Sequence, residues 1–148
     1  MVVWAVTLLV STQSSGSRAT IVILAWNAWE HTRPCLDSLR PTLRPGDQVV
    51  VVDNGSTDAT REELAKYPWV DVVGNDENCG FARGCNQGAA VARGDVIVFL
   101  NNDTIVHGGW LDELLAPFTD PEVGAVGPRS NRVSGHQLVE ASRTAVTI

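Results

Sequence analysis

The chain has 148 residues, of which 44% are hydrophobic and 19% are charged, which is ordinary for one globular domain with a real core. Its formal net charge of -6 argues against a nucleic-acid partner held by a broad basic surface. The three cysteines include no CxxC pair, and an odd number without metal-site spacing favours a reducing, cytoplasmic compartment.

The first 18 residues stand apart from the rest of the chain. Residues 2–10 are apolar apart from Thr7, but this run is far shorter than the roughly 20 residues that cross a bilayer. No basic stretch precedes it, so a signal peptide is weakly supported. We interpret residues 1–18 as an accessory or disordered segment: an accessory strand, a segment foreign to the domain, or a start assigned too early. The domain itself then covers residues 19–148.

Apolar runs and helical spacing alternate along the domain. Predicted strands cover residues 20–25, 48–52, 69–73, 96–100 and 123–126, and predicted helices lie between them at about 29–39, 60–66, 81–92 and 110–118. Alternation of this kind predicts an α/β fold, with a mostly parallel sheet, right-handed crossovers and helices on both faces.

Two of these helices carry local signals. Asp58 or Thr60 is expected to cap the second helix, with Thr60 and Glu63 as a capping box. In the third helix Gly80, Gly84 and Gly88 fall four residues apart and so line one stripe. Because each glycine inside a helix costs about 1 kcal/mol against alanine, the stripe suggests close approach to a strand or a ligand.

Two strands end in acidic or amide turns. Residues 49–52 lead into Asp53, and residues 96–100 lead into Asn101, Asn102 and Asp103. Strands of a parallel sheet deliver such residues to the carboxyl edge, where ligands bind. Asp53 is a candidate acceptor for a base N–H, the alternative being a turn with a helix cap. Asp103 is a candidate ligand for Mg²⁺ or Mn²⁺, with Asn102 near ribose or a metal-bound water; the alternative is a polar strand end.

The third helix begins after a polar loop. Asn78 and Gly80 precede it, so its N-terminus could lie near an anionic ligand, with Arg83 facing a nucleotide; a plain loop and an exposed arginine are the alternative. The chain contains no GxxxxGK[ST], no GxGxxG after the first strand and no GxSxG. These absences argue against a P-loop NTPase, a dinucleotide-binding fold and an α/β-hydrolase.

Taken in order, the motifs resemble those of the family 2 glycosyltransferases, which have the GT-A fold, a Rossmann-like sheet. The matching segments are residues 21–27 (IVILAWN), 51–58 (VVDNGSTD), 78–88 (NCGFARGCNQG) and 98–103 (VFLNND), followed by 109–111 and 123–128. The match covers about residues 20–130, and four motifs in register are specific. The sequence resembles bacterial rhamnosyltransferase-type enzymes of cell-surface polysaccharide assembly.

The resemblance implies a UDP- or dTDP-sugar donor and a divalent metal, Mn²⁺ or Mg²⁺. Asp53 matches the family's base-contacting acid, and Asp103 matches the metal ligand of its DxD motif, whose first acid is Asn101 here. Trp26 stands where the family usually has the tyrosine of Pro-x-Tyr-Asn. The donor-binding residues implied are Ala25, Asn27, Asp53, Asn54, Asn78, Gly80, Arg83, Asn102 and Asp103.

The implied reaction is inverting transfer of the sugar to a polysaccharide or lipid-linked acceptor, in the cytoplasm or at the inner face of the membrane. The family's catalytic base lies in an acidic motif well after the DxD position. Glu140 is the only acid in the tail and its setting does not match that motif, so the base is unassigned and the acceptor part is expected to be missing.

Two alternative functions and one possible assembly remain. A truncated or degenerate module would bind the nucleotide sugar without transferring it. A nucleotidyltransferase is disfavoured, because residues 26–29 lack a glycine-rich phosphate loop. A homodimer could form through a sheet face left uncovered.

Overall fold

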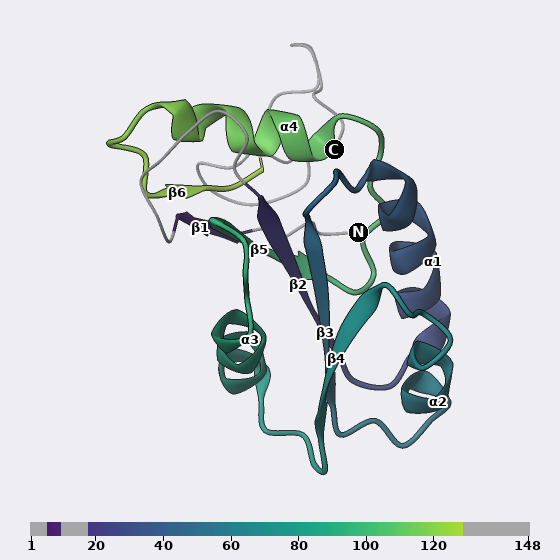
Figure 1. The fold of residues 1–148 in the computed structure, drawn as a ribbon. Coiled ribbons are helices and arrows are strands. Elements are labelled where there is room, and N and C mark those ends of the chain that lie inside the picture. Colours follow the sequence, from purple (N-terminus) through teal and green to yellow (C-terminus); the bar gives the residue numbers. More distant parts are fainter. Residues whose placement is uncertain (1–5, 10–17, 129–148) are drawn as a thin grey trace, which may run out of the picture.

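The computed structural model describes residues 6–9 and 18–128, and its centre is a six-stranded sheet in the order β4-β3-β2-β5-β1-β6 (Figure 1). Four strands are parallel: β2 (Ala19–Ala25), β3 (Gln48–Asn54), β4 (Val70–Asn75) and β5 (Val96–Asn101). This arrangement confirms the α/β fold with a mostly parallel sheet.

Helices cover both faces of the sheet, as expected. Helices α1 (Trp29–Leu39) and α2 (Thr60–Leu64) lie on one side of it in Figure 1, and α3 (Phe81–Ala90) lies on the other. Helix α4 (Trp110–Leu115) adds its buried side chains to the core on the α1 side. Two 3₁₀ turns, η1 (Arg40–Thr42) and η2 (Ala116–Thr119), follow α1 and α4.

The strands divide the core into two layers. Ile21 and Ile23 of β2 belong to the larger layer under α1, whereas Val22, with Leu24 packed against its cluster, faces α3. Successive side chains of a strand point to opposite faces, so a strand buried on both needs an unbroken apolar run. Every residue of β3 is buried for this reason, including Asp53 and Asn54 at its end.

The glycine stripe marks the contact between α3 and the sheet. A Cβ built on Gly84 would lie 2.4 Å from a methyl group of Leu24, and one on Gly88 would lie 2.3 Å from a methyl group of Val22. The expected close approach to a strand is therefore confirmed at these two positions. Gly80 differs, because nothing lies within 4 Å of its added Cβ and it precedes the helix with a φ of 86°.

Two local predictions about helix α2 were wrong. Its N-cap is Ala59 and carries no side-chain cap, so Thr60 and Glu63 form no capping box. Asp58, the other predicted cap, does accept a hydrogen bond from the backbone N–H of Thr60 at 3.0 Å, and Glu63 pairs with Lys66. The helix ends at Leu64 rather than near residue 66, because the chain turns ahead of Pro68.

The last strand is shorter than predicted, and its partner β1 is the strand that runs against the rest of the sheet. Strand β6 covers only Ala125–Val126 and pairs antiparallel with β1 (Val6–Leu9). Val123 belongs to a turn, since its N–H donates to the carbonyl of Asp120. Strand β1 also pairs antiparallel with β5, so the short strand near the N-terminus bridges the parallel sheet and β6.

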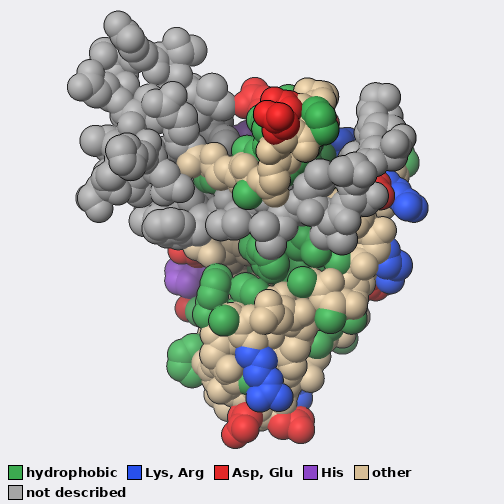
Figure 2. Space-filling model, turned by 90° about the vertical axis from the view of Figure 1, so that its left-hand side faces the viewer, with side chains coloured by type: hydrophobic (Ala, Val, Ile, Leu, Met, Phe, Trp, Pro, Cys, Tyr) green, Lys and Arg blue, Asp and Glu red, His purple; other side chains and the backbone are tan. Residues whose placement is uncertain are grey.

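The α3 side of the molecule faces the viewer in Figure 2, where hydrophobic side chains are exposed among polar ones. Phe81 is 65% exposed and Val91 is 43% exposed. The homodimer through an uncovered sheet face stays a prediction. None of the helices in residues 18–128 is long and apolar enough to cross a membrane.

Candidate functional site

The parallel strands end together at one edge of the sheet. Ala25 is paired in register with Asp53, and Leu24 with Asn101. Asn54 in turn lies opposite Asn75, the last residue of β4. The structure therefore places the predicted residues of three segments side by side at the carboxyl edge, the position where open parallel sheets bind ligands.

Asn27 fixes the loop that follows β3. Its side-chain oxygen accepts a hydrogen bond from the N–H of Thr57 at 2.8 Å, and its own N–H donates to the hydroxyl of Ser56 at 2.8 Å. Asn27 and Ala28 both have a φ of 56°, the left-handed region that costs non-glycine residues about 1–3 kcal/mol each. The bonds to the loop help to hold this conformation, so the turn after β2 and the turn after β3 form one unit.

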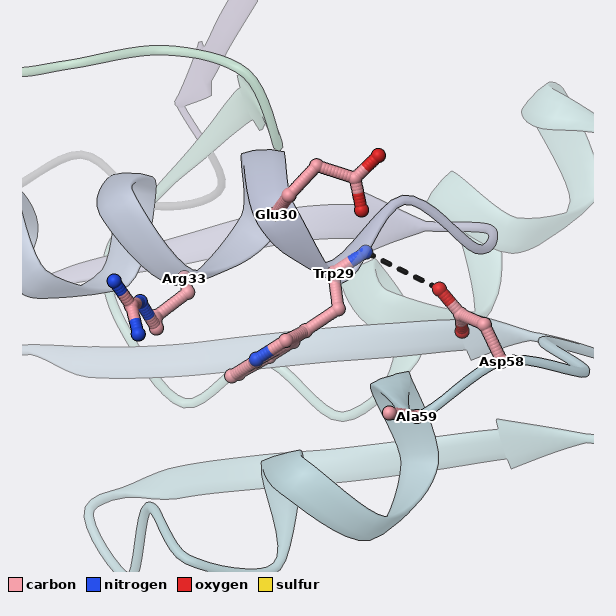
Figure 3. Close-up of a pocket in the computed structure, with 5 residues that line it drawn as sticks. All are labelled: Trp29, Glu30, Arg33, Asp58 and Ala59. Carbon is pink, nitrogen blue, oxygen red and sulfur yellow. Dashed lines mark hydrogen bonds between the residues drawn. The ribbon is translucent and has the colours of Figure 1, made fainter.

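Asp58 joins the first turns of two helices (Figure 3). Its carboxylate accepts hydrogen bonds from the N–H of Trp29 in α1 and of Thr60 in α2. These contacts lower the pKa of Asp58, because they outweigh the desolvation that opposes them. An open depression beside this contact is lined by Trp29, Glu30, Arg33, Asp58 and Ala59. None of the nine predicted donor-binding residues lines it, so we do not take it as the donor site.

Asp53 is fully buried, and both of its oxygens have partners. Oδ1 accepts from the N–H of Ser56 at 2.9 Å, and Oδ2 accepts from Nε of Arg61 at 2.7 Å. Arg61 also donates from Nη2 to the backbone carbonyl of Asn75, and its hydrogen bond to Asp53 raises its pKa. The ion pair therefore links the ends of β3 and β4.

Asn54 lies at the centre of a network of amides on the α3 side. Its Nδ2 donates to Oδ1 of Asn78 at 2.9 Å, and its Oδ1 accepts from Nδ2 of Asn75 at 3.0 Å and from the N–H of Cys79 at 3.1 Å. Asn75 and Gln87 exchange two hydrogen bonds of 2.9 Å. The network fixes the polar loop before α3 to both strand ends.

Gly55 lets this loop approach the end of β3. Its φ is 77°, and a Cβ built there would lie 2.5 Å from the backbone carbonyl carbon of Glu77. Any other residue would combine strain with a clash against backbone. Beyond the loop, the N–H of Gly80 donates to Oδ1 of Asn78, and Arg83 is exposed on α3.

The third segment follows β5. Asn102 donates from Nδ2 to the hydroxyl of Thr32, a buried residue of α1, at 3.0 Å. Asp103 is exposed, and within residues 18–128 no hydrogen bond to its carboxylate is formed. Burial raises the pKa of the nearby Cys35 thiol to about 12, against a hydrogen bond from Thr104, and the charge of Asp103 contributes in the same direction as burial. Cys35 is therefore a neutral core residue.

Residues 6–9 and 18–128 contain no group of three or more His, Cys, Asp or Glu side chains that could hold a metal ion. Asp103 offers one free carboxylate. This still fits Mg²⁺ or Mn²⁺, because such ions are often held by one or two carboxylates together with substrate phosphates and water.

Sequence reasoning missed three residues that shape this edge: Arg61, Asn75 and Gln87. In the sequence, Arg61 lies among charged residues typical of a solvent-exposed helix face, and nothing distinguishes Gln87 from the other polar residues of α3. One sequence signal bears on Gln87. The four-residue spacing of the glycines shows which face of α3 packs on the sheet, and Gln87 directly precedes Gly88 on that helix.

The comparisons with known proteins agree with this geometry. The sequence model of Glycosyl transferase family 2 matches residues 20–144. A "Pre-mycofactocin glycosyltransferase" of Mycobacterium tuberculosis is 33% identical over 112 residues, which cover 74% of this chain and 23% of that protein. A "Putative glycosyltransferase EpsH" of Bacillus subtilis is 27% identical over 99 residues, 65% of this chain and 29% of that protein.

Among solved structures, the mannosyltransferase PcManGT from Pyrobaculum calidifontis, in complex with GDP-Man and Mn²⁺, matches with a TM-score of 0.69 and 25% identity. The match covers 73% of this chain and 34% of that one. S. aureus TarS 1-349 in complex with UDP matches with a TM-score of 0.61 and 25% identity, over 67% of this chain and 31% of that one.

A parallel sheet with its polar strand ends at one edge defines the chain as a GT-A-type α/β domain. The chain belongs to glycosyl transferase family 2. It spans about a quarter to a third of the length of the relatives named above.

Proposed function

We propose that the chain forms the donor-binding part of an inverting glycosyltransferase, which transfers a sugar from a UDP- or dTDP-sugar to a polysaccharide or lipid-linked acceptor. The observation that carries this proposal is the meeting of four family motifs at one sheet edge. Register pairs Ala25 with Asp53 and Leu24 with Asn101, and the amide network adds Asn78 from the loop before α3.

The relatives support a nucleoside diphosphate as the common part of the donor. One neighbour was solved with GDP-Man and another with UDP. We propose uracil or thymine as the nucleobase of the donor because the motifs resemble those of enzymes that use UDP- or dTDP-sugars. A cytoplasmic location and a peripheral position on the membrane belong to the same proposal, and the free thiols of Cys35, Cys79 and Cys85 suit a reducing compartment.

The predicted residues divide into two groups by their contacts. The first group uses its side chains in hydrogen bonds between loops: Asn54 bonds to Asn78, and Asn27 bonds to the N–H of Thr57. We assign these three asparagines the role of shaping the donor site. Gly80, Arg83 and Asp103 are exposed at this edge or on α3. We assign Gly80 and Arg83 to the negatively charged diphosphate, near the N-terminus of the ten-residue helix α3.

Asp103 would hold the divalent metal. When bound, such an ion stabilises the negative charge that develops on the leaving diphosphate. Asn102 is held by Thr32 through its Nδ2, which leaves its side-chain oxygen for ribose or for a metal-bound water. The residue that removes the proton from the acceptor hydroxyl is not among the residues we assign.

Calorimetric titration of the chain with UDP and with dTDP, with and without Mn²⁺, tests the proposal. We expect Mn²⁺-dependent binding that Asp103→Ala weakens at least tenfold, while Glu113→Ala, which removes an exposed carboxylate of α4, leaves it unchanged. Absence of binding by either nucleotide would mean that family membership reflects ancestry rather than a working donor site.

A further inference from the structure

The acid that the motif resemblance assigns to the nucleobase is out of reach in this structure. The side chain of Asp53 is 0% exposed, and the N–H of Ser56 and Nε of Arg61 occupy its two oxygens. A base could accept or donate nothing at this carboxylate unless Arg61 moved away. Two hydrogen bonds hold Arg61 in this position, so the observed arrangement is the first one to consider.

Arg61 covers Asp53 and is itself accessible. Its side chain is 52% exposed, although it is held at two points, by the Asp53 carboxylate and by the carbonyl of Asn75. The guanidinium lies over the end of β4, where a Cβ built on Gly74 would be 3.7 Å from Nη2. Among the described residues, no acceptor is bonded to Nη1, so a planar donor group remains available beside the strand ends.

We propose that Arg61, rather than Asp53, makes the direct contact with the nucleobase of the donor, and that Asp53 is the positioning residue that orients the guanidinium. This inference rests on the proposed function, namely that a nucleoside diphosphate binds at this edge. An arginine donates hydrogen bonds and accepts none. It therefore suits the ring carbonyl oxygen of uracil, thymine or guanine, whereas adenine has no carbonyl and offers only ring nitrogens as acceptors.

The ion pair with the buried Asp53 reduces the entropy that Arg61 loses when it binds a base. A free arginine side chain loses about 2 kcal/mol of rotamer entropy when it is fixed. Here the carboxylate and the Asn75 carbonyl already fix it before the nucleotide arrives, so the contact to the base is pre-organised. Loss of a hydrogen bond from a charged donor corresponds to about a 10- to 100-fold weaker affinity.

The test compares UDP, ADP and inorganic pyrophosphate, each titrated in the presence of Mn²⁺. Wild type is expected to prefer UDP over ADP, and Arg61→Ala is expected to reduce that preference about 10- to 100-fold by weakening UDP while leaving pyrophosphate unchanged. Arg61→Lys keeps the charge but not the planar fork, so it should restore only part of the preference.

Arg93→Ala is the matched control. Arg93 also pairs with an aspartate, Asp71, at 2.8 Å, but it precedes β5, at the opposite edge of the sheet. This variant should leave the UDP-to-ADP ratio unchanged. Far-ultraviolet circular dichroism and thermal unfolding of each variant separate a lost contact from a lost fold, because misfolding would weaken pyrophosphate and UDP alike.

Asp53→Asn tests the positioning role. It removes the negative charge and leaves one side-chain oxygen for two donors, the N–H of Ser56 and Nε of Arg61. It should lower the UDP-to-ADP ratio in wild type, but it should have little further effect on the ratio in Arg61→Ala. An unchanged or tighter affinity of Arg61→Ala for UDP would overturn the inference and leave the proposed function intact. The same holds if Asp53→Asn lowers the ratio equally in both backgrounds. Wild type that binds no nucleoside diphosphate would contradict the proposed function itself.

Discussion

Replacing Asn54 by alanine should loosen the polar loop before α3 and destabilise the domain. Asn54 is 2% exposed and takes part in three N–H···O hydrogen bonds near 3 Å: 2.9 Å to Asn78, 3.0 Å from Asn75 and 3.1 Å from the N–H of Cys79. At about 1 kcal/mol net for each bond, the sum is about 3 kcal/mol. Water can reach the exposed Asn78 in the variant, so we expect a loss of about 2–3 kcal/mol.

Urea denaturation followed by tryptophan fluorescence measures this loss as a lower midpoint with an unchanged m-value. Asn78→Ala is the partial control, because it removes only the 2.9 Å bond to Asn54 and the bond from the Gly80 N–H. It should cost about 1 kcal/mol, because the N–H of the exposed Gly80 can bond to water instead. The argument fails if Asn54→Ala lies within about 0.5 kcal/mol of wild type, the range of ordinary surface substitutions, or if both variants cost the same.

Two further predictions concern the packing of α3 and the acid sensitivity of the fold. Gly88→Ala should destabilise by about 1–2 kcal/mol despite the better helix propensity of alanine, because its methyl would lie 2.3 Å from a stiff valine of β2. Gly84→Ala should cost less in the same urea experiment, since the leucine that it meets at 2.4 Å can rotate; equal costs would contradict this reasoning. Asp47 is desolvated, but hydrogen bonds from the Arg44 side chain and from the N–H groups of Ala19 and Arg44 outweigh that effect and lower its pKa below 3.8. Its contribution to stability is therefore complete above about pH 4 and is lost as the pH falls through the lowered folded-state pKa, so Asp47→Asn should flatten the acid limb of a stability-against-pH curve. An acid limb unchanged in that variant would assign the loss to other carboxylates.

Periodicity was enough to predict most of the fold. Unbroken apolar runs such as that of β3, alternating with helical spacing, can be buried only as parallel strands between two layers of helices. The same logic predicted the site edge, since the polar residues that follow β3 and β5 must emerge at the carboxyl ends of neighbouring strands. The errors were in short elements, namely the capping box and the end of α2 and the extent of β6, where local propensity competes with turns.

Within the candidate site, the sequence by itself determined which residue types reach the edge: Asp53, Asn54 and the segment from Asn101 to Asp103. Only the tertiary structure decided how they are used. Asn27 bonds to a residue 30 positions away, and Asn54 to one 24 positions away, and both pairings depend on strand register and on left-handed turns. Arg61 covers Asp53 because α2 returns across the ends of β3 and β4. Apolar patterning is a local signal that survives in one sequence, whereas hydrogen bonds between distant polar side chains exist only after the backbone has brought their atoms within about 3 Å of each other.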